Sequence, residues 1–233
     1  MCIIIAKKQG LLIPKKSTLQ NCFENNSDGA GYMFTLHNKV IIRKGYTTFK
    51  GFYKDLMRDT FKYNLKNKNV VMHFRIATSG GVTPAKTHPF PLSNNVDDLN
   101  KLDMLCNTGI AHNGVFYNYT YDKTLSDTQN YIKDFLYNIQ QLCTDFLHNT
   151  NAEALINNSL NYSKLAILNA SGLHTFGSFI EDEGVLYSND SYKRERYKVT
   201  TTPLYANYWD KYYKSTTEHT SGVYNNYDIY NEF

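Results

Sequence analysis

Short apolar runs separated by turn signals recur along this chain, and they constrain its fold more than any other feature. CIIIAK at residues 2–7 is a β-branched run suited to a buried strand. Residues 31–36 and 40–46 are apolar runs on either side of the polar break HNK, a pattern typical of a β-hairpin. Residues 162–179 alternate around Ser-Gly and predict a second hairpin. Because hairpins outnumber strand–helix–strand units, mostly antiparallel strands are expected.

Amphipathic segments between these runs predict helices, so the expected fold class is α+β. The clearest helix follows Ser126, which fits a capping box with Gln129. Its apolar face is expected to comprise Ile132, Phe135, Leu136, Ile139, Leu142, Cys143, Phe146 and Leu147. Residues 49–65 form a second amphipathic pattern. The pattern alone leaves the arrangement of layers open.

Size and composition exclude several classes of function. At 233 residues, the chain fits one fairly large domain whose core needs neither disulfides nor metals. A net charge of +4 is too small to indicate nucleic-acid binding. The four cysteines lack CxxC spacing, which argues against a zinc or redox site. No signal peptide or membrane-spanning run is recognisable, so we expect a cytoplasmic protein without metal or cofactor and without nucleic-acid or membrane partners.

Cys2 is the first candidate catalytic residue along the chain. A thiol near its ordinary pKa is mostly protonated at neutral pH and needs a base to become a good nucleophile. The small side chain at position 2 favours removal of Met1, which leaves Cys2 with an α-amino group of pKa about 7.7–8.0. That amine can accept the thiol proton and later return it to a leaving amine. The simpler alternative is a buried cysteine that opens a strand.

Three other places are ambiguous when each is taken alone. Arg75 ends a strand before a Gly-rich loop, where it can clamp a carboxylate or serve as a structural arginine. Asn113-Gly114 can offer two donors to an oxyanion or form an ordinary hairpin turn. Asp127 at a helix N-terminus can bind an ammonium group or simply cap the helix.

These residues belong to motifs that occur in a specific order. Along the chain lie Met1-Cys2, SDGAG at 27–31, HFRIATSGG at 73–81, THPF at 87–90, HNG at 112–114 and SDT at 126–128. In this order the chain resembles the class II glutamine amidotransferase domains of the N-terminal-nucleophile (Ntn) hydrolase superfamily, and especially their short stand-alone members. The resemblance covers roughly residues 2–190. It implies a four-layer αββα sandwich of two antiparallel sheets.

The resemblance also implies a role for each matching residue. Cys2 is expected to be the nucleophile, with its own amine as general base, and to release ammonia from glutamine through a γ-glutamyl thioester. The Asn113 side chain and the Gly114 N–H are expected to form the oxyanion hole. The implied substrate-binding and supporting residues are Arg75 for the α-carboxylate, Asp127 for the α-ammonium group, Thr78 in the pocket wall and His88 beside the site.

Two positions depart from the family pattern. Ser79 stands where many members have a histidine, and Ile76 where an aromatic residue often follows the arginine. Another small amide or a γ-glutamyl compound therefore remains an alternative substrate. A non-catalytic ligand-binding or interaction protein on the same scaffold is the third hypothesis.

The predicted domain spans residues 2–204, and a Tyr-rich tail at 205–233 is expected to pack on it. Docking of that tail on a partner is the alternative. The residues beyond the resemblance contain no P-loop, dinucleotide fingerprint or sugar-phosphate motif. A separate ammonia-accepting protein is therefore the expected partner.

Overall fold

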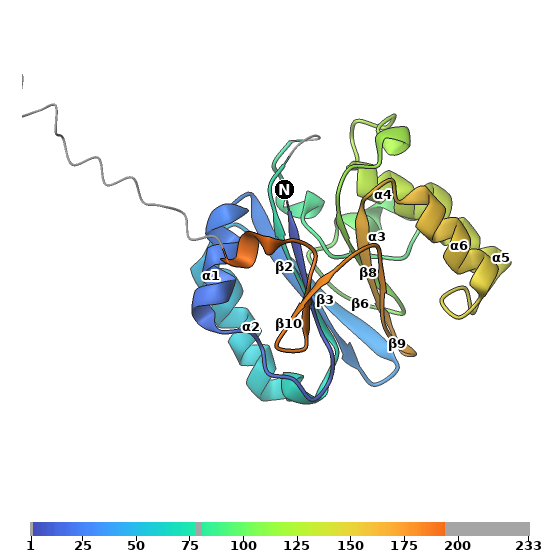
Figure 1. Ribbon diagram of the computed structural model, residues 1–233. Helices are drawn as coiled ribbons and strands as arrows, with labels where there is room; N and C mark the ends of the chain where they lie inside the picture. The colour runs from blue at the N-terminus through green and yellow to red at the C-terminus, as the bar shows by residue number, and fades with distance from the viewer. Residues whose placement is uncertain (1, 78–80, 194–233) are drawn as a thin grey trace, which may run out of the picture. The chain divides into compact units, whose positions relative to one another are not determined.

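Two antiparallel β-sheets form the centre of the structure, a computed structural model that describes residues 2–77 and 81–193 (Figure 1). The larger sheet has the strand order β10-β11-β1-β4-β2-β3-β6, with β1 (Ile3–Lys7), β2 (Gly29–Leu36), β3 (Lys39–Tyr46), β4 (Val70–Arg75), β6 (Asp103–Cys106), β10 (Ile180–Asp182) and β11 (Val185–Tyr187). The smaller sheet has the order β5-β7-β8-β9, with β5 (Phe90–Pro91), β7 (Gly109–Asn113), β8 (Lys164–Asn169) and β9 (Gly172–Phe176). Both predicted hairpins are present, as β2–β3 and β8–β9. The prediction of mixed helices and antiparallel strands is confirmed.

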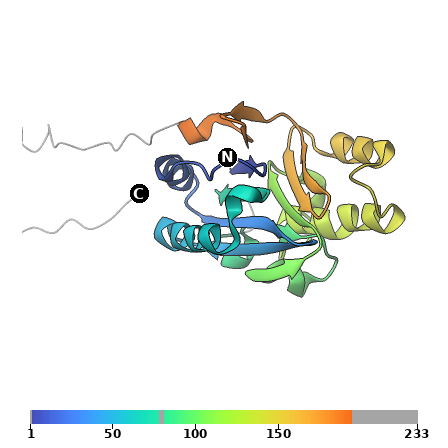
Figure 2. The ribbon, with the colours of Figure 1, turned by 90° about the horizontal axis from the view of Figure 1, so that it is seen from below.

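Helices flank the two sheets (Figure 2). On the larger sheet pack α1 (Lys16–Asn25) and α2 (Phe49–Tyr63). Against the smaller sheet pack α4 (Asp127–Tyr131), a π-helical segment (Ile132–Leu136), α5 (Tyr137–Leu142) and α6 (Thr150–Ser159). Shorter helical pieces are η1 (Leu65–Asn67), η2 (Pro84–Lys86), α3 (Val96–Asn100), η3 (Tyr117–Tyr119) and η5 (Asp190–Lys193). Across the described ranges, every helix is too short or too polar to span a membrane.

The apolar run at the N-terminus is explained by the position of β1 between two buried layers. Ile3 and Ile5 belong to the apolar cluster between the larger sheet and helices α1 and α2. Ile4 and Ala6 belong to a second cluster, which joins the two sheets face to face. All four side chains are fully buried. A strand that is covered on both faces needs a continuous apolar run rather than an alternating one.

The predicted long helix after Ser126 differs from the structure in its last part. The helical region ends at Leu142, and Cys143 has an extended backbone. Leu142 was expected on the apolar face but is 90% exposed. Ile139 also follows the π-helical segment and stays buried against the smaller sheet, whereas Leu142 is the last helical residue, so the expected face is interrupted where the helix ends.

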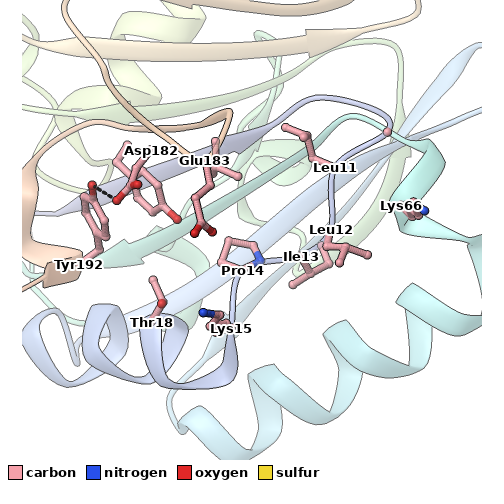
Figure 3. Close-up of a pocket in the computed structure, with 13 residues that line it drawn as sticks. Leu11, Leu12, Ile13, Pro14, Lys15, Thr18, Lys66, Asp182, Glu183 and Tyr192 are labelled. Carbon is pink, nitrogen blue, oxygen red and sulfur yellow. Dashed lines mark hydrogen bonds between the residues drawn. The ribbon is translucent and has the colours of Figure 1, made fainter.

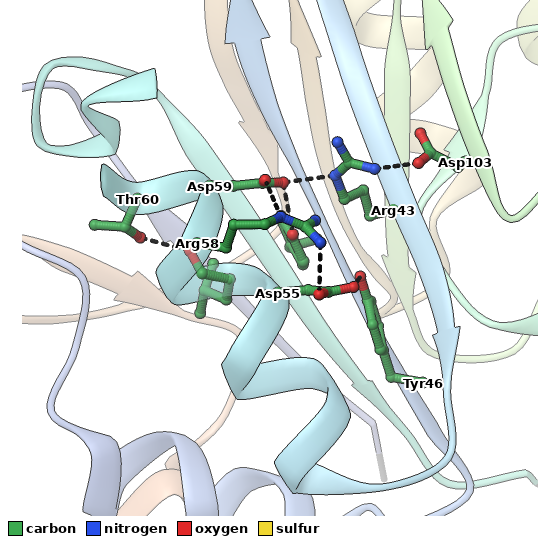
Figure 4. Close-up of polar contacts among 9 residues, drawn as sticks. Arg43, Tyr46, Asp55, Arg58, Asp59, Thr60 and Asp103 are labelled. Atoms are coloured by element: carbon green, nitrogen blue, oxygen red, sulfur yellow. Dashed lines mark hydrogen bonds and ion pairs between the residues drawn. The ribbon is translucent and has the colours of Figure 1, made fainter. Parts of the chain in front are cut away.

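A buried carboxylate fastens α2 to the larger sheet (Figure 4). Asp59 is fully buried and accepts hydrogen bonds from Tyr32 Oη at 2.8 Å and Arg58 Nε at 3.1 Å. It also binds Arg43 Nε, and the guanidinium of Arg43 continues to Asp103 on β6. The charge of Asp59 is therefore compensated within the layer that it occupies.

Lys7, at the end of β1, is a second buried polar anchor. Its side chain is fully buried, and Nζ lies 2.8–3.1 Å from the five backbone carbonyl oxygens of Lys8, Leu11, Leu65, Lys66 and Lys68. Burial lowers the pKa of Lys7 to about 8, so the ammonium form prevails at neutral pH. One side chain thus ties β1 to the loop that follows it and to the segment around η1.

Candidate active site

Cys2 lies directly before β1, between the ends of strands β4 and β11. Its Sγ is 3.4 Å from both the amide nitrogen and the carbonyl oxygen of Ile76. Its own carbonyl accepts a 2.7 Å hydrogen bond from Asn189 Nδ2. Burial raises the pKa of the Cys2 thiol, and the neighbouring Arg75 charge opposes that rise. The thiol therefore needs a proton acceptor before it can act as a nucleophile.

Arg75 ends β4, which pairs with β1, so the guanidinium comes close to Cys2. The residue is 5% exposed, and its Nη2 donates to the carbonyl of Gly81 at 3.0 Å. Burial lowers the pKa of Arg75, whereas Cys2, Asp28 and Asp127 raise it. Cys2, Asp28 and Asp127 therefore all interact electrostatically with the Arg75 guanidinium.

Asp127 is the first residue of α4, and Ser126 rather than Asp127 caps the helix. The Ser126 hydroxyl and the Gln129 side chain form the predicted capping box. The Asp127 Oδ2 instead accepts the backbone N–H of Phe116 at 2.8 Å. Burial raises the pKa of Asp127, and the charge of Arg75 opposes this. With capping assigned to Ser126, the carboxylate of Asp127 can take part in ligand binding.

The Asn113-Gly114 pair ends β7 and is not a hairpin turn, because the chain continues into the η3 region and β7 pairs with β8. Gly114 has φ +149°, and a Cβ there would lie 2.1 Å from Ser163 Oγ. Only glycine fits that space. The Asn113 side chain donates through Nδ2 to Ser188 Oγ at 2.8 Å.

The SDGAG and THPF motifs contact each other. A Cβ on Gly29 would lie 2.3 Å from Thr87 Cγ2, and one on Gly31 would lie 2.2 Å from the His88 carbonyl oxygen. The two glycines of β2 thus make room for the loop that carries His88. The THPF motif thereby lies next to β4, where His88 contacts His73.

Three buried histidines lie at the site, and two of them, His88 and His112, line its cavity. His73 Nε2 donates to the His112 carbonyl at 2.9 Å, and His88 lies 4.2 Å from His73 between ring centres. Thr128 Oγ1 is 2.8 Å from His112 Nδ1 and 3.2 Å from His88 Nε2. Burial lowers the pKa of His73 and of His112 to about 3 and that of His88 well below its usual value. Burial therefore favours the neutral form of all three rings at neutral pH.

A small cavity brings most of the predicted site residues together. Its volume is about 30 Å³, and its wall includes Cys2, Arg75, His88, Gly114 and Asp127. Asn113 is adjacent to Gly114 but does not line the cavity, and Thr78 and Ser79 lie outside the described residues. A water molecule needs about 10–15 Å³ of such space, so the cavity has room for only a few of them.

A much larger cavity, of about 630 Å³, lies elsewhere (Figure 3). It is bounded by the loop between β1 and α1, by the β10–β11 hairpin and by Tyr192. None of the described candidate residues lines it. Volume alone would make this cavity the candidate ligand site, whereas the candidate catalytic and binding groups line the smaller one.

Ser188 and Asn189 are the site residues that sequence reasoning missed. They bind Asn113 and Cys2 respectively, yet in the sequence they form part of SND, which reads as an ordinary turn. No local signal distinguishes them. Among the described residues, no group of three or more His, Cys, Asp or Glu side chains is placed to hold a metal ion.

Comparison with known proteins adds no identity. No protein-family model matches the chain, and a search of curated proteins finds no match.

Proposed function

We propose that this protein is a glutamine amidotransferase or glutaminase that uses Cys2 as its nucleophile after removal of Met1. The observation that carries the proposal is the convergence of Cys2, Arg75, Gly114 and Asp127 on one cavity. These residues come from four separate places in the sequence. A thiol, a cation, an anion and a glycine N–H are the groups that a free amino acid with a side-chain amide requires.

Recognition of glutamine depends on its two charged ends. The guanidinium of Arg75 can take the α-carboxylate through two parallel hydrogen bonds. The carboxylate of Asp127 can take the α-ammonium group, since Asp127 and Arg75 line the same cavity. Thr78 is proposed to complete the pocket. Asparagine would satisfy both ends but leave its amide short of Cys2, which carries a steep kinetic cost.

The reaction begins with transfer of the Cys2 thiol proton to the Cys2 amine. Sγ then bonds to the carboxamide carbon, and the carbonyl electron pair moves onto oxygen. The Gly114 N–H and the Asn113 side chain stabilise that oxyanion. The protonated amine of Cys2 gives its proton to the carboxamide nitrogen as the carbon–nitrogen bond breaks, so ammonia departs and a γ-glutamyl thioester remains. Water cleaves the thioester to glutamate and restores the thiol.

The same proposal assigns the fold to the four-layer αββα type of the Ntn hydrolases. The support for this assignment is the order of the three apolar clusters, one between the sheets and one between each sheet and its helices. The position of the nucleophile before a strand covered on both faces supports it as well. The domain would release ammonia to a separate acceptor protein in the cytoplasm.

The test is glutamate release from glutamine by protein whose loss of Met1 has been verified by intact mass. We expect release by the wild type and none by Cys2→Ala. Cys106→Ala is the matched control, since Cys106 is another half-buried, free cysteine, and it should retain full activity. Equal release by wild type and Cys2→Ala, or complete retention of Met1 in the purified protein, would end the proposal.

The small volume of the cavity favours one second candidate, hydrolysis of another small amide by the same nucleophile. Ile76 contributes to the wall at the place where members of the resembled family often have an aromatic residue. Competition kinetics with glutamine, asparagine, γ-glutamyl amides and simple aliphatic amides separate the two. A clear preference for free glutamine removes this alternative.

A further inference from the structure

The turn after β11 joins the nucleophile's strand to the side chain of Asn113. Ser188 is fully buried, and its Oγ accepts hydrogen bonds from the Ile4 N–H and from Asn113 Nδ2, both at 2.8 Å. The Ser188 N–H donates to the Ile4 carbonyl at 3.0 Å. One serine therefore contacts both the backbone two residues after Cys2 and the amide proposed for the oxyanion hole.

The next residue strengthens this connection. Asn189 Nδ2 donates to the Cys2 carbonyl at 2.7 Å, and its Oδ1 accepts the Ser191 N–H at 3.0 Å. Lys164, at the start of β8, donates through Nζ to the Ser188 carbonyl. The turn thus contacts both sheets, through β1 in the larger sheet and through Asn113 and Lys164 in the smaller one.

We propose that Ser188 is a positioning residue for the oxyanion hole, an inference that rests on the proposed function. An Asn side chain has two amide hydrogens, and Ser188 takes one of them. The other hydrogen is not used by Ser188, and it is the one that we assign to the substrate oxygen. Because the same hydroxyl binds Ile4, the amide is held at a fixed place relative to the strand that carries Cys2.

The chemical benefit is preorganisation. An oxyanion hole accelerates the reaction only when its donors are already aimed at the place where negative charge develops. Without Ser188, the Asn113 carboxamide can rotate about its terminal torsion, which is intrinsically broad for Asn. Turnover then falls although glutamine still binds through Arg75 and Asp127.

A double-mutant cycle on kcat separates positioning from mere structural support. We expect Ser188→Ala to lower kcat about 10- to 100-fold, less than the roughly 100- to 1,000-fold typical of losing an oxyanion-hole donor, with KM changed less than about threefold. In an Asn113→Ala background, Ser188→Ala should have almost no further effect, because the group that it positions is absent. Ser171→Ala, in an exposed turn, is the control and should leave kcat unchanged.

Ser188→Cys provides the conservative variant and carries the cycle if Ser188→Ala does not fold. Its thiol keeps a weak acceptor in nearly the same space, so kcat should lie between those of wild type and Ser188→Ala. Full additivity of Ser188→Ala and Asn113→Ala overturns the inference, as does a change confined to KM.

A spectroscopic readout keeps this test separate from the proposed function. The side-chain amide signals of Asn113 in a nitrogen–proton NMR spectrum, assigned by their loss in Asn113→Ala, should shift in Ser188→Ala. Unchanged signals overturn the contact itself. Absence of Cys2-dependent ammonia release from wild type, together with shifted signals, overturns the proposed function and leaves the Ser188–Asn113 contact intact.

Discussion

Replacement of Gly114 by alanine tests how tightly the proposed oxyanion hole is built. The new Cβ would lie 2.1 Å from Ser163 Oγ, 2.7 Å from Ser163 Cβ and 2.9 Å from Ser163 Cα. Ordinary contacts begin at 3.4 Å, so the nearest atom must retreat by about 1.3 Å and the backbone must move with it. Overpacking of this kind costs about 1–3 kcal/mol. The positive φ adds a further cost of about 1–3 kcal/mol.

Gly172 offers a matched control. It has φ +141°, close to the +149° of Gly114, but a Cβ there meets nothing within 4 Å. Gly172→Ala should therefore be destabilised only by the unfavourable φ. Gly114→Ala should be less stable than Gly172→Ala by about 1–3 kcal/mol. Adding Ser163→Gly to Gly114→Ala removes the two side-chain clashes and should restore part of that difference.

Chemical denaturation of the variants measures these free energies, and glutamine turnover measures the effect on the site. Displacement of the Gly114 N–H should lower kcat about 100- to 1,000-fold, whereas Gly172→Ala should leave kcat unchanged. Equal losses of stability in the two alanine variants would refute the reasoning, since they would mean that the contact with Ser163 does not restrict this position.

Three further predictions concern pH and the buried polar groups. Acidification from pH 6.5 towards pH 3 should destabilise the protein progressively, because the unfolded chain binds protons on His73 and His112 whereas these rings stay neutral in the folded protein. Each of the two should contribute up to about 1.4 kcal/mol per pH unit, and His88, whose pKa burial also lowers, should act in the same direction. Urea midpoints that are constant between pH 7 and 4 would contradict this. Lys7→Met at pH 7 should cost about 2–5 kcal/mol in unfolding free energy, since it leaves the carbonyl oxygens around the ammonium without their donor. Thermal and urea unfolding within 0.5 kcal/mol of wild type, a roughly neutral change, would show that solvent replaces the ammonium there. In protein that retains Met1, alkylation of Cys2 should keep accelerating above the pH at which exposed thiols reach their plateau, because burial raises its pKa; mass spectrometry of iodoacetamide adducts checks this, and an early plateau contradicts it.

The sequence predicted those parts of the molecule that depend on local pattern. The hairpins, the capping box of Ser126 and the apolar strand after Cys2 follow from residue type and spacing. The motif order placed Cys2, Arg75, Gly114 and Asp127 in one site, and the structure places all four around one cavity. That these residues perform the proposed chemistry stays a prediction.

What the sequence did not reveal depends on contacts between distant segments. The helix after Ser126 ends at Leu142, although the apolar periodicity continues to Leu147. The glycines of SDGAG serve a close approach by THPF, which the spacing of neither motif predicts. Ser188 and Asn189 gain their importance only because β11 lies beside β1. For the glycines and for Ser188 and Asn189, the cause is tertiary packing rather than local propensity.

The apolar run after Cys2 also raises a question of register. Ile3, Ile4 and Ile5 are alike, and both faces of β1 are buried, so hydrophobic pattern alone penalises a one-residue slip very little. Such a slip would move Cys2 by about 3.3 Å, whereas a misplacement of about 1 Å already costs a large factor in rate. The polar contacts at the two ends of the strand must therefore define the register. At one end the Lys7 ammonium group donates to backbone carbonyl oxygens, and at the other the Ser188 hydroxyl accepts the Ile4 N–H. On this argument Lys7 helps to fix the position of Cys2, although it does not line the site.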